Sequence, residues 1–285
     1  MASDGRVRKI THRHFLAADS GPPSNSLWFK KSAFTEMVKA MRLNRVPLLK
    51  RLIPSVGKRI VPLIWPRGWR VAEFHGALFL VNYFSFLDRR VGFDRDWELE
   101  QIAYFLENLE ERKSEIFLDI GACGGLYAIL IAKAGCCNRI IAFDPDQRCR
   151  ERLFANLHLN GLSGRVEVRL EAVSDRNGTL SFFCETPFAI GKSHVVIGGG
   201  GDCTVPCVRL DDDLGELRGK RIAIKVDVEG HELETLAGMK SLLTSNRCFL
   251  QVESFDDHVA AVRRQLADLG YRLIREIGPD RYFSN

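Results

Sequence analysis

From residue 116 to the C-terminus, short apolar runs alternate with longer segments in which apolar residues recur at helical spacing. The apolar runs predict buried strands, because they are short and are bounded by turn residues. They are Ile116–Ile120, Arg139–Phe143, Val166–Leu170, Ile222–Val226 and Cys248–Val252. The intervening segments predict helices at Leu126–Ala134, Gln147–Asn160, Glu232–Leu243 and Asp256–Leu269. This alternation is typical of an α/β fold with a mostly parallel sheet and helices on both faces.

Two further segments precede this core. Trp69–Phe86 predicts a hairpin that turns near His75-Gly76, and Glu98–Arg112 predicts a helix with one buried face. We therefore expect one domain over residues 69–285, with a lead-in over 69–113 and a Rossmann-like core over 114–285.

Two segments of the core depart from the regular alternation of strands and helices. Tyr271–Arg275 and Tyr282–Phe283 predict a terminal antiparallel pair at the sheet edge. Gly178–Val208 interrupts the alternation of strands and helices with Thr179–Cys184, a glycine run and Thr204–Val208. It predicts a β-rich insertion or flexible loop beside the ligand crevice, where it could cover a substrate.

The N-terminal quarter differs from the rest in charge. Residues 1–72 hold 15 Lys and Arg against three acids, whereas the whole chain has a net charge of only +5. We assign residues 1–68 to a basic tail and an amphipathic helical segment. Residues 34–65 mix apolar and basic side chains, which favours peripheral contact with anionic lipid or docking on a partner. The alternative is an ordinary core-packing helix with a solvated basic face.

Hydropathy, cysteine spacing and aromatic content bear on the cellular location of the protein and on its partners. No apolar stretch approaches the roughly 20 residues of a membrane span, and no signal-peptide pattern is present. The eight cysteines lack zinc-type spacing, so we expect reduced thiols in a cytoplasmic protein, one that associates with a membrane surface if residues 34–65 contact lipid. The basic segment lacks the interleaved aromatic residues that stack bases, which argues against nucleic acid as a partner. The sequence does not indicate an oligomeric state.

The ends of the predicted strands carry the candidate chemistry, because ligands of open parallel sheets bind outside the carboxyl ends of the strands. After the first strand, Gly121 permits a tight turn and Gly125 permits close packing of the next helix. Asp119 could accept hydrogen bonds from a cationic amino acid moiety. The turn reads G-x-x-G-G, which departs from the G-x-G-x-x-G of dinucleotide folds.

Asp144 ends the second strand, directly before Pro145. A carboxylate at this place can accept both hydroxyls of a ribose, whereas its alternative role is to cap the next helix. After the third strand, Ala172 and Val173 could flank an adenine, although the same residues would serve in an ordinary turn. These positions predict a nucleoside site.

The fourth strand runs directly into Asp227, Glu229 and His231. Such clustering of charge at a strand end is costly and is typical of functional sites. Asp227 is the first candidate for a catalytic base or for orienting a hydroxyl, and Glu229 and His231 follow. The structural alternative is that Glu229 caps the next helix and that Lys225 neutralises a neighbouring acid.

Five motifs together resemble the FkbM-type methyltransferases. They are Asp119–Gly125, Phe143–Pro145, Ala172–Asp175, Val205–Asp211 and Lys225–Glu232, in the order and spacing of that family. The resemblance covers roughly residues 84–255. Cys123 departs from it, since the family usually has asparagine there.

The resemblance implies a class I methyltransferase fold with a mostly parallel, seven-stranded sheet. It also implies transfer of a methyl group from S-adenosylmethionine to a hydroxyl of a sugar, glycolipid or secondary metabolite. The residues that would bind the methyl donor are Asp119, Gly121, Ala122, Cys123, Gly125, Asp144, Pro145, Ala172 and Val173.

Three alternatives stay open. An NAD(P)-dependent dehydrogenase shares the glycine turn and the acidic residue that binds the ribose. The third glycine of its G-x-G-x-x-G motif is out of register here. A catalytically silent adaptor would keep the fold and bind a membrane or partner through its basic N-terminus. A divalent metal held by Asp227 and Glu253 could activate the acceptor. We expect no metal site, because no further ligand cluster is visible.

Overall fold

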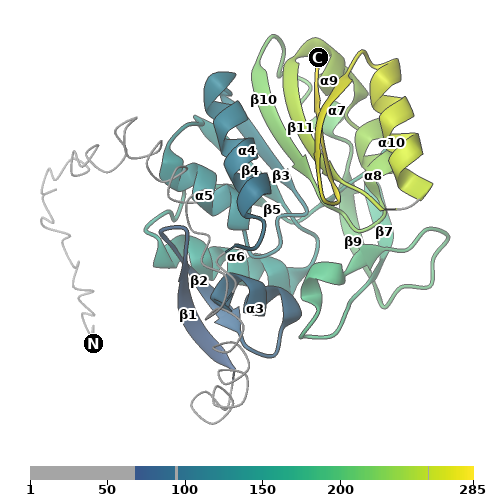
Figure 1. Ribbon diagram of the computed structural model, residues 1–285. Coiled ribbons are helices and arrows are strands. Elements are labelled where there is room, and N and C mark those ends of the chain that lie inside the picture. The colour runs from purple at the N-terminus through teal and green to yellow at the C-terminus, as the bar shows by residue number, and fades with distance from the viewer. Residues whose placement is uncertain (1–67, 94–95, 256) are drawn as a thin grey trace, which may run out of the picture.

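The structure is a computed structural model that describes residues 68–93, 96–255 and 257–285 (Figure 1). The predicted basic tail and the segment 34–65 lie outside the described residues.

A seven-stranded sheet forms the centre of the described chain. Its order is β12-β13-β11-β10-β3-β4-β5, and the pairs from β11 to β5 are parallel. The predicted seven-stranded, mostly parallel sheet is thus confirmed, as is the antiparallel pair at its edge. The strands are β3 (Ile116–Ile120), β4 (Arg139–Phe143), β5 (Glu167–Arg169), β10 (Arg221–Val226), β11 (Arg247–Glu253), β12 (Arg272–Ile277) and β13 (Asp280–Ser284).

The order of the strands in the seven-stranded sheet predicts where the ligand crevice lies. From β3 the chain first adds β4 and β5 on one side and later adds β10 and β11 on the other. The carboxyl ends of β3 and β10 therefore flank a point at which the direction of winding reverses. Open α/β sheets bind their ligands in the crevice at such a point.

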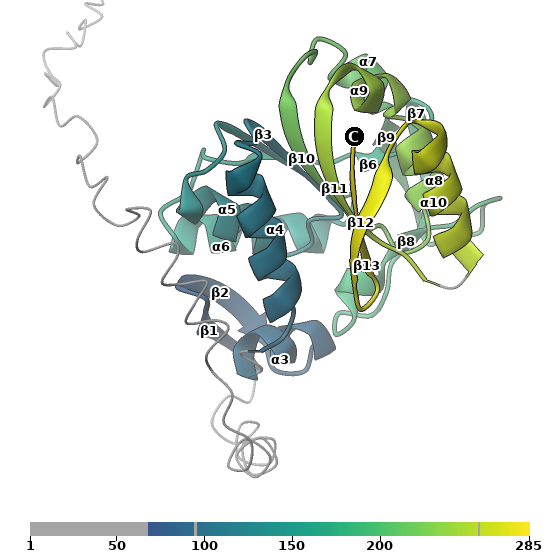
Figure 2. The same ribbon diagram turned by 45° about the horizontal axis from the view of Figure 1, so that its top comes forward.

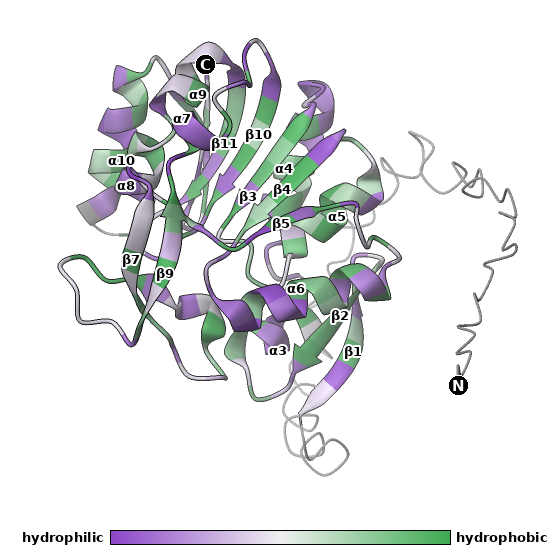
Figure 3. Cartoon of the chain, turned by 180° about the vertical axis from the view of Figure 1, so that it is seen from behind, coloured by the Kyte–Doolittle hydropathy of each residue, from purple (hydrophilic) through white to green (hydrophobic). Residues whose placement is uncertain are grey.

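Helices cover both faces of the sheet (Figures 1 and 2). One apolar core joins α4, α5 and α6 to one face, and a second joins α7, α8, α9 and α10 to the other. The central strands are accordingly hydrophobic along most of their length (Figure 3). The helices are α4 (Leu99–Glu111), α5 (Leu126–Ala134), α6 (Gln147–Leu159), α7 (Leu210–Asp213), α8 (Glu232–Ala237), α9 (Lys240–Ser245) and α10 (Asp257–Asp268).

The predicted lead-in hairpin is present as β1 (Trp69–Phe74) and β2 (Ala77–Asn82), and a short helix, α3 (Phe86–Phe93), follows it. The hairpin shares the apolar core of α4, α5 and α6. A buried ion pair adds to this contact, because Arg152 of α6 donates to Asp88 of α3 at 2.7 Å. The backbone N–H of Asn82 also donates to Asp88, at 2.8 Å.

The single helix predicted over Glu232–Leu243 is wrong, because the chain forms α8 and α9 with a break at Gly238. The carbonyl of Gly238 accepts the N–H of Asp211, at 2.9 Å, and does not continue the helix. The carboxylate of Asp211 in turn accepts the N–H groups of Ser241 and Leu242 and so caps α9. This contact joins segments that are distant in sequence, so helical periodicity does not reveal it.

The insertion is β-rich, as predicted. It contributes β7 (Gly178–Phe183), β8 (His194–Val195) and β9 (Cys203–Val208) to a second sheet of order β6-β9-β7-β8. The first strand of that sheet, β6, consists of Ala172–Val173.

Within the described ranges, no helix is both long and apolar enough to cross a membrane.

Arg152→Ala should lower the free energy of unfolding by about 3–5 kcal/mol, because it leaves the Asp88 carboxylate buried without its partner. Arg139→Ala is the control, since its pair with Glu167 is exposed and should contribute less than about 1 kcal/mol. Urea unfolding measures both. Equal, small losses for the two variants would show that the Asp88–Arg152 pair does not stabilise the lead-in.

Candidate functional site

A cavity of about 580 Å³ opens at the carboxyl ends of β3, β4 and β10. A smaller cavity adjoins it behind the glycine turn and is lined by Asp119 and Ala122. Gly125 lines neither cavity. The predicted site residues that line the larger cavity are Gly121, Cys123, Asp144, Pro145, Ala172, Val173, Asp227, Glu229 and His231.

The glycine turn after β3 combines two close contacts. Gly121 has φ +84°, and a Cβ atom there would lie 1.8 Å from the carbonyl oxygen of Asp227. At Gly125, a Cβ would lie 2.1 Å from Leu153 of α6. Gly121 therefore lets β3 and β10 approach each other under the cavity, whereas Gly125 lets α5 pack against α6.

Cys123 lies in the same turn at φ +46°, a conformation that few residues other than glycine adopt. Its backbone N–H donates to Asp144 at 2.7 Å, so this contact does not depend on the side chain. The Cys123 thiol faces that of Cys149, with the two Sγ atoms 3.4 Å apart.

Asp144 lies at the end of β4 with its side chain buried. One carboxylate oxygen accepts the N–H of Cys123 and the other accepts that of Asp146, at 2.8 Å. Burial raises the pKa of Asp144 to about 7, although both hydrogen bonds oppose the rise. The cap of α6 is Asp146, which accepts the N–H of Arg148, so Asp144 is not that cap.

Asp119 is buried behind the turn and accepts the N–H of Ala128 at 3.1 Å. Burial raises its pKa to about 6, and the positive charge of Lys225 opposes that rise. The cation that faces Asp119 in the structure is therefore a lysine of the neighbouring strand.

The three candidates after β10 have different surroundings. Asp227 accepts a hydrogen bond from the Lys225 ammonium at 2.6 Å, so Lys225 neutralises a neighbour as the sequence suggested. Glu229 has φ +52° and makes no hydrogen bond or ion pair within the described part of the chain. Burial, and then the charge of Asp227, raise its pKa to about 7. Its carboxylate does not cap α8.

His231 is buried, and its Nε2 lies 3.0 Å from the hydroxyl of Ser174. Burial lowers its pKa, so the imidazole is neutral at neutral pH. The side chain thus links the turn after β10 to the segment after β6.

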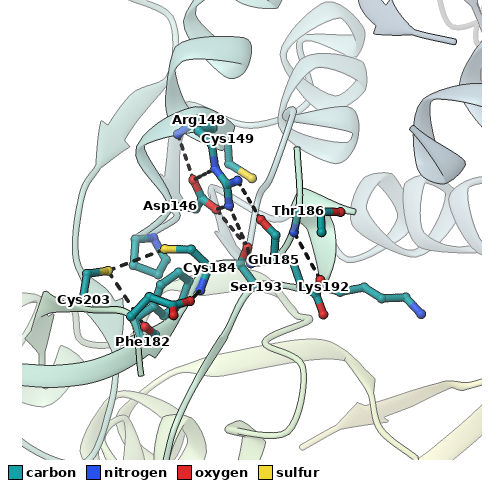
Figure 4. Close-up of polar contacts among 12 residues, drawn as sticks. Asp146, Arg148, Cys149, Phe182, Cys184, Glu185, Thr186, Lys192, Ser193 and Cys203 are labelled. Atoms are coloured by element: carbon teal, nitrogen blue, oxygen red, sulfur yellow. Dashed lines mark hydrogen bonds and ion pairs between the residues drawn. The ribbon is translucent and has the colours of Figure 1, made fainter. Parts of the chain in front are cut away.

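The insertion forms one wall of the cavity, with Phe182 and residues 188–195 in the lining. Arg148 and Asp146, at the start of α6, hold it in place (Figure 4). Arg148 donates to the carbonyl of Glu185 at 2.7 Å, and Ser193 donates to Asp146 at 2.9 Å. In the same view the Lys192 side chain points away from this network.

The sequence did not single out three cavity residues, namely Trp97, Glu98 and Asp280. Trp97 and Glu98 directly precede α4, and Asp280 begins β13. A helix boundary and a hairpin turn were visible at these places, but no pattern indicated that they meet at the crevice.

Several acidic side chains surround Lys225 near Trp97, Glu98 and Asp280. Burial opposes ionisation of Lys225, yet the carboxylates of Asp227, Glu98, Asp119 and Glu253 raise its pKa. Burial raises the pKa of Glu98 to about 7 and that of Glu253 to about 9. No group of three or more His, Cys, Asp or Glu side chains in the described residues has a geometry suited to a metal ion.

The strand order and the glycine turn define the class of the protein, a Rossmann-like methyltransferase fold with a cavity at the carboxyl ends of its strands. Residues 119–273 match the sequence model of the methyltransferase FkbM domain. The chain belongs to the FkbM methyltransferase family, and the predicted resemblance is confirmed.

Two curated relatives are similar over part of their length. The hexuronic acid methyltransferase AglP of Haloferax volcanii is 31% identical over 52% of this chain and 59% of its own length. The 2-O-methyltransferase NoeI of Sinorhizobium fredii is 28% identical over 53% of this chain and 68% of its own. This chain therefore spans less than two thirds of AglP.

Among solved structures, the methyltransferase FkbM of Methylobacillus flagellatus is 18% identical with a TM-score of 0.44. The alignment covers 61% of this chain and 44% of that one.

Glu253→Gln should stabilise the free protein, and increasingly so as pH rises. The pKa of Glu253 rises from its ordinary value of 4.5 to about 9 on folding, so the folded state holds this proton more tightly. The stability that this tighter proton binding gives the wild-type protein is fully present below the ordinary pKa of Glu253, 4.5, and is lost as pH rises toward about 9. Melting temperatures between about pH 5 and about pH 9 should show a growing difference between variant and wild type.

The exposed Glu111 provides a control, because Glu111→Gln should show no such trend. A difference between Glu253→Gln and wild type that is constant with pH would contradict the raised pKa of Glu253.

Proposed function

We propose that this protein transfers the methyl group of S-adenosylmethionine to a hydroxyl oxygen of a saccharide. The observation that carries the proposal is the buried Asp144 carboxylate, which ends β4 beside the Gly121 turn in a chain of the FkbM family. The cavity extends from Asp144 to Asp227 and Glu229 and has room for a nucleoside and an acceptor group.

The residues present suit the methyl donor. Each oxygen of Asp144 accepts one backbone N–H and keeps lone pairs for the two hydroxyls of a ribose. Ala172 and Val173 offer apolar surface to an adenine, and Gly121 lines the cavity without a side chain. When bound, S-adenosylmethionine supplies a methyl group on a positively charged sulfur, a centre that an oxygen nucleophile can attack.

An alcohol is a poor nucleophile, so a base must remove its proton during transfer. A base works best when its pKa is close to the working pH, and the pKa of Glu229 is raised to about 7. Asp227 instead accepts a hydrogen bond from the Lys225 ammonium at 2.6 Å, so one of its oxygens is already engaged. We therefore place proton removal on Glu229 and orientation of the hydroxyl on Asp227.

His231 fits a supporting role. Its Nε2 is engaged with Ser174, and its side chain is buried. The ring can therefore hold the turn that carries Glu229 without itself accepting the proton.

A saccharide acceptor suits the mixed lining of the cavity. Phe86 and Phe188 lie at the cavity with about half of their surfaces exposed, at 57% and 50%. Polar groups such as Gln101 and His194 share the lining. Sugars present both apolar ring faces and hydroxyls, and the name of AglP, a hexuronic acid methyltransferase, supports this acceptor class. The name of NoeI, a 2-O-methyltransferase, supports transfer to oxygen.

The direct test incubates the protein with radiolabelled S-adenosylmethionine and a panel of neutral and uronic acid oligosaccharides. Label should appear on a saccharide and should survive mild alkali, because a methyl ether is stable there and a methyl ester is not. Label that alkali removes completely would shift the acceptor from a hydroxyl to a carboxylate. Thermal stabilisation by NADH, without stabilisation by S-adenosylmethionine, would support the dehydrogenase alternative and contradict the proposal.

Asp144→Ala should weaken binding of S-adenosylmethionine by on the order of 2–3 kcal/mol, because it removes a pair of charge-assisted hydrogen bonds. Calorimetry measures the change. The exposed Asp268 supplies a matched control, since Asp268→Ala should bind as wild type does. If Asp144→Ala also binds normally, the ribose does not lie at β4.

Glu229→Gln should lower kcat by roughly a hundredfold or more with little effect on binding of the methyl donor. Asp227→Asn should retain more turnover than Glu229→Gln, because it disturbs orientation and keeps the base. Steady-state kinetics with a saccharide acceptor distinguish the two. Near-normal turnover of Glu229→Gln together with an inactive Asp227→Asn would return the role of base to Asp227.

A further inference from the structure

Glu98 lies outside the segment that matches the family, yet it lines both cavities of the crevice. It directly precedes α4, where acidic side chains often cap the helix. Here its backbone carbonyl accepts the N–H of Ile102 at 2.8 Å, but its side chain makes no capping hydrogen bond. The carboxylate is therefore not used to begin the helix.

The surroundings of Glu98 hold more negative than positive groups. Lys225 is the cation that opposes the raised pKa values of Glu98, Asp119 and Asp280. Glu253 and Asp227 face the same lysine. One ammonium thus faces five carboxyl groups, an arrangement that favours binding of a further cation.

The shape of the crevice gives the direction of the ligand. In the proposed function the ribose contacts Asp144 at the end of β4, and the adenine lies toward Ala172 and Val173. The cavity continues past Gly121 to Trp97 and Glu98. We infer that the substituent on the 5′ carbon of the ribose extends toward Trp97 and Glu98, and in S-adenosylmethionine that substituent ends in an amino acid.

We propose that Glu98 binds the ammonium group of the methionine part of the methyl donor. Through this contact the protein would distinguish the complete donor from nucleosides that lack the amino acid. The inference rests on the proposed function and adds a binding residue from the lead-in to those of the family domain.

Asp119, which the sequence suggested for this contact, is less suited to it. Its side chain is buried behind the turn, accepts the N–H of Ala128 and lines only the smaller cavity. The carboxylate of Asp119 is better placed to balance Lys225. Glu98 lines the larger cavity and receives a hydrogen bond from the hydroxyl of Tyr127.

The test measures binding of three ligands by calorimetry without any acceptor: S-adenosylhomocysteine, its analogue without the amino group, and 5′-methylthioadenosine. Glu98→Gln should bind S-adenosylhomocysteine about 10- to 100-fold more weakly than wild type does. It should bind 5′-methylthioadenosine with unchanged affinity, which also shows that the variant is folded. Glu100→Gln is the matched control, because Glu100 is exposed on α4 and pairs with Arg275.

The analogue without the amino group tests the same contact from the side of the ligand. Wild type should bind it more weakly than S-adenosylhomocysteine, whereas Glu98→Gln should bind the two alike. Equal loss of affinity for all three ligands in Glu98→Gln, or equal affinity of wild type for the two homocysteine ligands, would overturn the role of Glu98. Failure of wild type to bind any of the three would instead overturn the proposed function.

Discussion

The close approach of the Gly121 turn to the end of β10 is the constraint on which the crevice depends. Only a residue without a Cβ fits at position 121, because that atom would lie 1.8 Å from the carbonyl oxygen of Asp227. The approach joins β3 to β10 at the point where strand order reverses. It thereby brings the glycine turn, Asp144 and the acids after β10 around one cavity.

The same approach concentrates negative charge. Lys225 lies beneath the turn and faces acids from β3, from the turn after β10, from β11, from the start of α4 and from β13. Burial keeps the pKa values of Glu98 and Glu253 well above those of exposed carboxyl groups. A positively charged ligand would favour the ionised forms of these carboxyl groups, and S-adenosylmethionine carries positive charge at both its sulfur and its amino group.

The sequence predicted the parts of the fold and site that depend on local pattern. The limits of β3, β4 and α5 follow from short apolar runs and from Gly121 and Gly125, and the strand-end rule placed Asp144 and Asp227 together. The break between α8 and α9 was missed because it depends on a tertiary contact between Gly238 and Asp211. Glu98 was missed for the same reason, since only folding brings the start of α4 to the crevice. The roles of the site residues, the boundary at residue 68 and the contact of residues 34–65 with lipid stay predictions.

The measurement that tests this account most directly is a crystal structure with S-adenosylhomocysteine bound. We predict that the ribose hydroxyls contact Asp144 and that the amino acid arm passes Gly121 and ends at Glu98. A nucleoside bound away from Asp144, or in the reverse direction with its adenine toward Glu98, would contradict it.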